Sequence, residues 1–301
     1  MSIILVACRR TRIFLLLFAK KRKAVKYVWT EEYSYAIMIM VLDKTYANSN
    51  AVVDHTEESI MLELKNIGFE VNTPEQSKEI LKDINLTINE RFVAITGPNG
   101  GGKSTLAKVI AGIIKPTTGR ILLDGEDITD LDITERAKRG VSFAFQQPVR
   151  FKGLTVRDLI TLAAGKPIGV SEACDYLSEV GLCAKDYINR EVNASLSGGE
   201  LKRIEIAMII ARGTKLSVFD EPEAGIDLWS FSNLIQVFEK MHEKINGSIM
   251  IISHQERILN IADRIIVLAN GQVQAQGTRD EVLPHLLAGT GSVCSVLTDK
   301  L

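Results

Sequence analysis

The feature that most constrains the fold is a glycine-rich stretch, GPNGGGKST, at residues 97–105. It fits the pattern G-x-x-x-x-G-K-[ST] and has the required surroundings, an apolar strand-like stretch before it (FVAIT, 92–96) and a helical stretch after it. Glycines let a backbone curl closely around a phosphate, because they have no Cβ to clash. A glycine-rich turn that binds nothing is the weaker alternative, given the Lys-Ser-Thr ending. We therefore predict a nucleotide phosphate loop made of Gly97, Pro98, Asn99, Gly100, Gly101, Gly102, Lys103, Ser104 and Thr105.

Two side chains of this loop carry specific expectations. The backbone N–H groups and the positive end of the following helix favour phosphate charge. Lys103 is expected to reach the β- and γ-phosphates of the nucleotide, and the Ser104 hydroxyl to bind Mg²⁺. The helix is expected to stop at Gly112, with Pro116 beyond it.

Two further apolar stretches end, like the first, in residues of unusual chemistry. LSVF (216–219) is followed by Asp220-Glu221, and SIMIIS (248–253) is followed by His254. Both stretches are apolar on both faces, which is typical of strands buried in a parallel sheet. Ligands bind beyond the carboxyl ends of the strands in such sheets. We therefore expect the three strand ends to lie side by side and to form one site.

The paired carboxylates at 220 and 221 are predicted to have different tasks. Asp220 is expected to hold Mg²⁺, directly or through water. Glu221, one residue further, is placed to orient or deprotonate the water that attacks the γ-phosphate. The alternative is that both carboxylates cap the next element, which Pro222 would suit as a first helical residue. The phosphate loop favours the catalytic interpretation.

Two more polar residues are candidates for the same site. Gln146, in the loop sequence FAFQQPV, is a candidate to bind Mg²⁺ or the attacking water, and Gln147 beside it is the alternative. His254 is expected to contact the γ-phosphate, because it follows a buried strand whose end meets the others. The alternative for His254 is a core histidine with its hydrogen bonds satisfied.

The stretch SLSGGELKR (195–203) predicts a second phosphate-binding end. Ser197 and Glu200 fit the Ser-x-x-Glu capping box that starts a helix. An ordinary cap accounts for these two residues but not for the adjacent Gly198 and Gly199, which cost helix stability unless a ligand or backbone approaches closely. Because a helical segment separates this cap from Lys103, we expect it to face the γ-phosphate held by the other subunit of a two-fold dimer.

Taken together, these motifs resemble those of the ATP-binding cassette (ABC) ATPases, in the family's order and over roughly 61–285. The resemblance implies an α/β fold, a P-loop NTPase with a RecA-like core, an antiparallel β subdomain and a helical signature subdomain. It implies a head-to-tail homodimer that sandwiches two ATP molecules with Mg²⁺, closes on binding ATP and opens after hydrolysis. Glu221, His254 and Gln146 are then catalytic, and Asp227 belongs to the loop after the paired carboxylates.

Finer details resemble the cassette ATPase of the SUF iron–sulfur cluster assembly system (the SufC type). These are the stretch after Gln146, GGELKR, DEPEAGID and SHQERIL. The resemblance implies a cytoplasmic subunit that works with a scaffold pair of the SufB/SufD type. Transport cassettes usually place an aromatic residue near the end of the first strand to stack on adenine. That position is Val71 here, with Phe69 two residues earlier, so adenine stacking is in doubt. The alternative is the motor subunit of a membrane ABC transporter, with a permease bound around 146–160.

Composition excludes other classes. The net charge of −1 gives no electrostatic case for a nucleic-acid partner, which disfavours a stand-alone nucleic-acid or translation ATPase. The four cysteines are scattered, without a C-x-x-C pair, as in a cytosolic protein with reduced thiols. No apolar run approaches the ~20 residues that a membrane span needs.

Three segments are expected. Residues 1–60 differ from the rest, since the first 30 carry eight Lys or Arg and no Asp or Glu. We expect a poorly ordered N-terminal extension there, the alternative being a basic membrane- or partner-binding segment. Residues 61–285 are expected to form the ATPase domain, with the helical subdomain at about 143–205 and a tail at 286–301. At the domain start, MLELKNIGFEV alternates like an edge strand.

Overall fold

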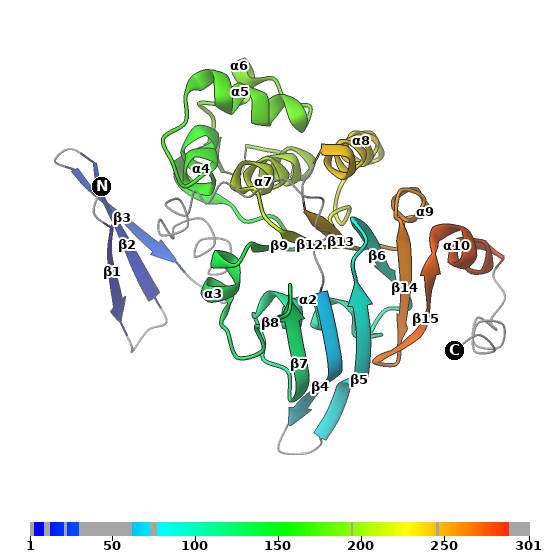
Figure 1. The fold of residues 1–301 in the computed structure, drawn as a ribbon. Coiled ribbons are helices and arrows are strands. Elements are labelled where there is room, and N and C mark those ends of the chain that lie inside the picture. Colours follow the sequence, from blue (N-terminus) through cyan, green and yellow to red (C-terminus); the bar gives the residue numbers. More distant parts are fainter. Residues whose placement is uncertain are drawn as a thin grey trace.

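A computed structural model describes residues 3–8, 13–20, 23–29, 62–72, 77–193, 195–244 and 247–288. Its centre is a six-stranded sheet in the order β15-β14-β6-β13-β12-β9 (Figure 1). Five strands run parallel, and β15 pairs antiparallel with β14. The α/β fold predicted from the sequence is therefore present. The strands are β6 (Phe92–Thr96), β9 (Val141–Ala144), β12 (Leu216–Asp220), β13 (Ser248–Ile252), β14 (Arg264–Ala269) and β15 (Gln272–Thr278).

A second sheet is antiparallel, in the order β5-β4-β7-β8, and lies away from helices α4–α7 (Figure 1). Its strands are β4 (Leu62–Asn72), β5 (Ser77–Ile88), β7 (Thr118–Leu123) and β8 (Glu126–Asp127). The prediction of an edge strand in MLELKNIGFEV was wrong. β4 is central, because β5 and β7 pair with its two edges. Alternation reports only that one face of a strand is buried, and an inner strand of a one-sided antiparallel sheet alternates just as an edge strand does.

Helices cover the central sheet and extend beyond it. Those packed on or near the sheet are α2 (Lys103–Ala111), α3 (Ile133–Lys138), α8 (Leu228–Lys244), α9 (Glu256–Leu259) and α10 (Arg279–Leu287). A mostly helical region follows β9 and comprises β10 (Phe151–Thr155), α4 (Val156–Ala163), α5 (Val170–Glu179), α6 (Ala184–Tyr187), β11 (Glu191–Val192) and α7 (Gly198–Arg212). The helical subdomain expected at about 143–205 falls largely on this region, although residues 143 and 144 belong to the central sheet.

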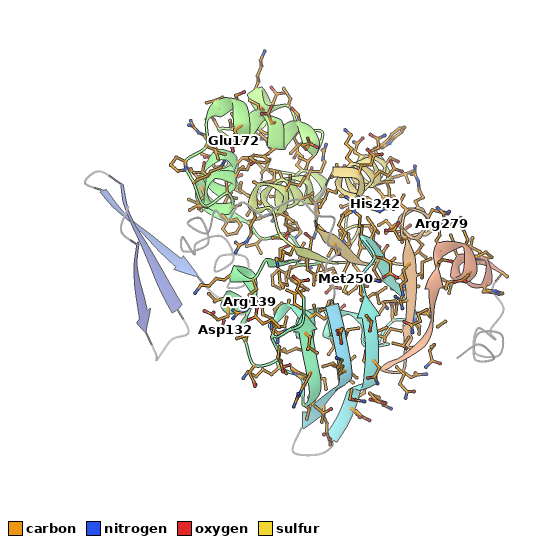
Figure 2. The ribbon with its side chains drawn as sticks, viewed as in Figure 1. Asp132, Arg139, Glu172, His242, Met250 and Arg279 are labelled. Atoms are coloured by element: carbon orange, nitrogen blue, oxygen red, sulfur yellow. The ribbon has the colours of Figure 1, made fainter. Side chains whose placement is uncertain are left out.

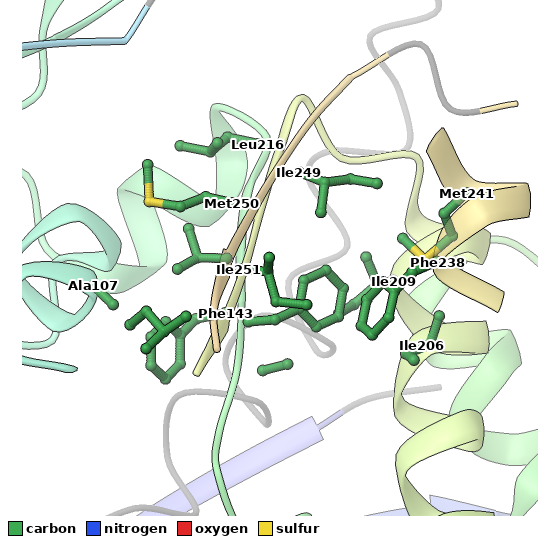
Figure 3. Packing of buried hydrophobic residues seen from close by; sticks show 14 of the residues in the cluster. Ala107, Phe143, Ile206, Ile209, Leu216, Phe238, Met241, Ile249, Met250 and Ile251 are labelled. Carbon is green, nitrogen blue, oxygen red and sulfur yellow. The ribbon is translucent and has the colours of Figure 1, made fainter. Parts of the chain in front are cut away.

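The core fills both faces of the central sheet. Every residue of β6, β12 and β13 is buried, as expected for parallel strands covered on both sides. Met250 and Ile249 are neighbours in β13 and point to opposite faces, toward Ala107 of α2 and toward Met241 of α8 (Figure 3). Charged side chains such as Glu172 and Arg279 lie on peripheral helices (Figure 2).

The backbone near the N-terminus forms a separate antiparallel sheet of β1 (Ile3–Cys8), β2 (Ile13–Lys20) and β3 (Lys23–Trp29). Residues 30–61 and 289–301 lie outside the described residues, so the expected extension over 1–60 and tail over 286–301 stay predictions. Among the described helices, none has the length and apolar character to cross a membrane.

Candidate active site

The three strand ends singled out in the sequence meet at one edge of the sheet. β6, β13 and β12 are consecutive neighbours, and all three run in the same direction. The phosphate loop leaves β6, Asp220 ends β12, and His254 follows β13 by two residues. This arrangement confirms the expectation that the strand ends lie side by side.

The phosphate loop turns sharply between β6 and α2. Gly97, Gly100 and Gly102 have φ values of 130°, 76° and 101°, a region that side chains with a Cβ rarely adopt. A Cβ on Gly97 would lie 2.1 Å from the carbonyl oxygen of Leu268, so the loop rests directly on the end of β14. α2 then begins at Lys103, which places the helix N-terminus at the mouth of the loop.

Lys103 is buried and folds back over the loop that precedes it. Its Nζ donates hydrogen bonds to the carbonyl oxygens of Gly97 at 2.8 Å and Pro98 at 2.9 Å. Burial lowers the pKa of Lys103, and the charges of Glu221 and Asp220 partly offset that effect. The ammonium group therefore stands within the loop, close to both carboxylates.

Ser104 and Asp220 are joined directly, although 116 residues separate them. The Ser104 hydroxyl donates to Asp220 Oδ1 at 2.9 Å. Burial raises the pKa of the buried Asp220 carboxyl, while the Ser104 hydrogen bond opposes the shift. Among the described residues, no group of three or more His, Cys, Asp and Glu side chains could hold a metal ion. One hydroxyl and one carboxylate nevertheless fit Mg²⁺, which takes oxygen ligands and completes its shell with water and phosphate oxygens.

Glu221 is held from three directions. Its backbone N–H donates to the Ile252 carbonyl at 3.0 Å, and its φ of 44° lies in the left-handed region, a strained conformation for a non-glycine residue. The Gln146 amide nitrogen donates to Glu221 Oε2 at 2.6 Å, and His254 Nε2 lies 3.7 Å from Glu221 Oε1. Gln146, rather than its neighbour Gln147, therefore donates a hydrogen bond to the Glu221 carboxylate.

His254 is half-exposed beside Glu221, so it is not a buried core histidine. Burial and the Lys103 charge lower its pKa, whereas Glu221 raises it. The neighbouring residues that support it were not among the predicted site residues. The Ser253 hydroxyl donates to Glu223 Oε1 at 2.5 Å and accepts from the Gln255 N–H at 3.0 Å. The extra acidic residue in DEPEAGID was the available signal for this contact.

The predicted capping box at the start of α7 is present. The Ser197 hydroxyl accepts from the Glu200 N–H at 3.2 Å, and the Glu200 carboxylate accepts from the Ser197 N–H at 2.7 Å. A Cβ on Gly199 would lie 2.7 Å from Cβ of Ser230, so a contact within the chain already requires this glycine. A Cβ on Gly198 would meet its nearest neighbour, the Gly225 carbonyl oxygen, at an ordinary 3.4 Å. Close packing in the monomer therefore accounts for Gly199 but not for Gly198.

The loop between Glu221 and α8 carries Asp227. Its Oδ1 accepts hydrogen bonds from the backbone N–H groups of Trp229 and Ser230, both at 3.0 Å, and these bonds lower the pKa of Asp227. Asp227 thus caps the first turn of α8. Since Gly199 packs on Ser230, this first turn is in contact with the start of α7.

A buried ion pair in α7 also escaped the sequence analysis. Lys202 and Glu205 are almost fully buried, and their charged groups are 3.3 Å apart. Lys202 Nζ donates to the carbonyl oxygen of Phe145, the residue before Gln146. Two opposite charges three residues apart, on a helix with many buried apolar residues, were the signal.

Comparisons with known proteins agree with this geometry. An ABC transporter family model matches residues 81–224. The uncharacterised ABC transporter ATP-binding protein MJ0035 of Methanocaldococcus jannaschii is 42% identical over 215 residues, 68% of this chain and 86% of that protein. The probable ATP-dependent transporter ycf16 of Cyanophora paradoxa is 35% identical over 239 residues, 74% of this chain and 90% of that protein. A solved dimeric structure of the ATP-binding cassette MJ0796, in a post-hydrolysis state bound to ADP and Pi, is similar with a TM-score of 0.65 and 27% identity, covering 72% of this chain and 98% of that chain.

The chain therefore belongs to the ABC transporter ATP-binding family. It has the ABC ATPase fold, with the P-loop NTPase core expected from the sequence. It is an ATPase that takes ATP together with Mg²⁺.

Proposed function

We propose that the residues gathered at the strand ends form one half of an ATP hydrolysis site. Gly97 to Thr105 bind the phosphates, with Lys103 on the β- and γ-phosphates. Ser104, Asp220 and Gln146 hold Mg²⁺, which neutralises phosphate charge when bound. The observation that carries this proposal is the Ser104–Asp220 hydrogen bond of 2.9 Å, because it brings the helix after the phosphate loop to the end of β12.

In this proposal Glu221 is the general base. It takes a proton from a water molecule whose oxygen attacks the γ-phosphorus, and the bond to the bridging oxygen of ADP breaks. Gln146 and His254 orient the groups around that water, and both already stand beside the Glu221 carboxylate. The lowered pKa of His254 keeps its imidazole neutral at neutral pH, so it can donate to phosphate through one nitrogen without a net charge.

The second half of the site comes from another copy of the chain. Ser197, Gly198 and Gly199 stand at the N-terminus of α7, where unpaired N–H groups and the helix dipole favour a phosphate. We propose that two copies close head-to-tail on ATP and separate after hydrolysis. The dimeric state of the similar MJ0796 cassette supports this arrangement.

The partner that this motion drives is proposed to be a SUF iron–sulfur cluster scaffold in the cytoplasm. The motifs GGELKR, DEPEAGID and SHQERIL favour it, and so does the adenine end of the site. Val71 is exposed, and Phe69 packs partly buried against the core, so an aliphatic side chain stands where a transport cassette offers an aromatic ring. Gln147 and Arg150 are exposed in the segment 146–160, so it presents side chains that a partner can contact.

The alternative is a motor subunit of a membrane ABC transporter. Its specific support is that relatives, including the ycf16 protein, are described as transporters. The same face at 146–160 would then receive a helix of a permease.

A pull-down of the chain from its own cells, under anaerobic conditions and followed by mass spectrometry, separates the two partners. Scaffold proteins carrying iron and sulfide are the expected result. A multi-span membrane protein in their place would overturn the cluster-assembly assignment and leave the ATPase chemistry intact. A variant with Arg150→Glu, an exposed residue of this segment, should lose the partner, while the exposed Lys240→Glu on α8 is the matched charge-reversal control.

A further inference from the structure

The buried pair Lys202–Glu205 lies on α7, which begins with Gly198 and Gly199. We call these two residues the signature glycines and α7 the signature helix. Their side chains are 2% and 9% exposed, so both charged groups are withdrawn from water. Lys202 Nζ donates to the carbonyl oxygen of Phe145 and lies 3.3 Å from Glu205 Oε2. The pair thus joins the middle of α7 to the chain just beyond β9.

Stabilisation of the folded chain alone does not explain why this pair is buried. Removing two charges from water is expensive, and apolar residues of similar volume often do as well or better. Glu205 Oε1 has no hydrogen-bond partner, although it is buried. Burial raises the pKa of Glu205, and the Lys202 charge and the Phe145 N–H only oppose that shift. Apolar side chains could not replace one contribution of the pair. Lys202 donates a hydrogen bond to the Phe145 carbonyl and thereby fixes the backbone at that residue.

Phe145 is the residue directly before Gln146. Its ring packs edge-on against Phe143 of β9, with ring centroids 4.8 Å apart, and its carbonyl is held by Lys202. The backbone is therefore fixed up to the point where Gln146 projects toward Glu221. A shift of α7 would therefore move the Phe145 carbonyl and, with it, the position of Gln146.

We propose that Lys202 is a positioning residue for the metal-binding glutamine. Through the Phe145 carbonyl it sets where Gln146 stands, and it links the signature helix to the Mg²⁺ end of the site. Glu205 holds the Lys202 ammonium in place for this contact. The inference rests on the proposed function, in which Gln146 is a Mg²⁺ ligand.

The test is a titration of ATPase activity with Mg²⁺ at fixed, saturating ATP. Gln146→Ala is the reference, and Lys202→Met is the test variant. Because outer-shell groups that orient a metal ligand affect metal affinity by about 10- to 100-fold, Lys202→Met should raise the Mg²⁺ concentration at half-maximal activity about 10-fold. Much of the maximal rate should return at saturating Mg²⁺.

Lys202→Met leaves Glu205 buried without its cation and threatens the fold. The double variant Lys202→Met/Glu205→Leu removes both charges together and should melt at a higher temperature than Lys202→Met, although the Phe145 backbone loses its side-chain partners. It still lacks the hydrogen bond to the Phe145 carbonyl, so it should show the same raised Mg²⁺ requirement. Leu177→Ala, a fully buried change on α5, is the stability control and should lower the melting temperature with the Mg²⁺ requirement unchanged.

Three outcomes are distinguishable. A raised Mg²⁺ requirement in Gln146→Ala and in the double variant supports the proposal. A raised requirement in Gln146→Ala with a parental value in the double variant overturns the positioning role of Lys202 and leaves the role of Gln146 standing. A parental value in Gln146→Ala overturns the proposed metal role of Gln146, and the inference about Lys202 falls with it.

Discussion

Gln146 donates a hydrogen bond of 2.6 Å to Glu221 Oε2, across 75 residues of sequence, while His254 approaches the other carboxylate oxygen. Three segments that are far apart in the chain thus meet at one carboxylate. Changes to single groups of this site and of the signature helix should therefore have separable effects.

Replacing Glu221 by Gln should remove the general base and leave the geometry of the site unchanged. The amide of the variant can still accept from Gln146, so nucleotide binding and melting temperature should stay close to parental. General base catalysis contributes about 10²–10⁴-fold, and turnover should fall by that order. Steady-state phosphate release measures it. Glu239→Gln, an exposed change on α8, is the control, and a parental rate in Glu221→Gln would refute the assigned base.

Lys103→Ala should weaken ATP binding. A hydrogen bond to a charged group contributes about 1.5–3 kcal/mol, which corresponds to about 10- to 100-fold in the dissociation constant. The variant also loses the Lys103 hydrogen bonds to the Gly97 and Pro98 carbonyls, whereas the packing of Gly97 on β14 does not involve this side chain. Calorimetry with ATP provides the measurement, with the exposed Lys240→Ala as control. Equal affinities in the two variants would count against the phosphate loop.

The two signature glycines should respond differently to alanine. Gly199→Ala forces its Cβ against Ser230 and should destabilise the folded chain by about 1–3 kcal/mol. Ser230→Gly in the same chain should restore much of that loss. Gly198→Ala has room in the monomer, so its stability should be parental or higher, while ATP-dependent dimer formation should weaken. Denaturant unfolding and light scattering separate the two effects, and normal dimerisation of a stable Gly198→Ala would contradict the second one.

The stability contributed by His254 should depend on pH. Its pKa is lowered in the folded chain, chiefly by burial, from an ordinary value of 6.5. The folded state therefore binds this proton less readily than the unfolded state. Stability from this group is complete above about pH 6.5 and is lost as pH falls through the lowered pKa. Relative to His254→Gln, the parental chain should lose unfolding free energy between pH 7 and pH 5. A pH-independent difference would show that its pKa is unperturbed.

The sequence predicted the strand ends and the glycine loop because these depend on local signals. A glycine loop between an apolar strand and a helix is compatible with few folds, and parallel strands must present the same ends together. The capping box of Ser197 and Glu200 was equally local. Gln146 could be distinguished from Gln147 only once the chain path beyond β9 was known.

Other features depend on distant parts of the chain. The place of β4 between β5 and β7 follows from pairings across up to 61 residues, which alternation cannot encode. A glycine is required at position 199 because a Cβ there would clash with Ser230 of the next helix. The hold of Lys202 on Phe145 spans 57 residues, so no local pattern could predict it.

ATP should close two copies of the chain around a site to which both contribute, and the Glu221→Gln variant should hold this dimer because it hydrolyses ATP slowly. Light scattering after size-exclusion chromatography measures the mass with ATP and Mg²⁺ and without them. We expect the monomer mass of 33.2 kDa without ATP, twice that mass with it, and a return to monomer when Ser197→Arg is added. A Glu221→Gln chain that binds ATP but stays monomeric, or a dimer that Ser197→Arg leaves intact, would show that the two copies do not share the ATP site in this way.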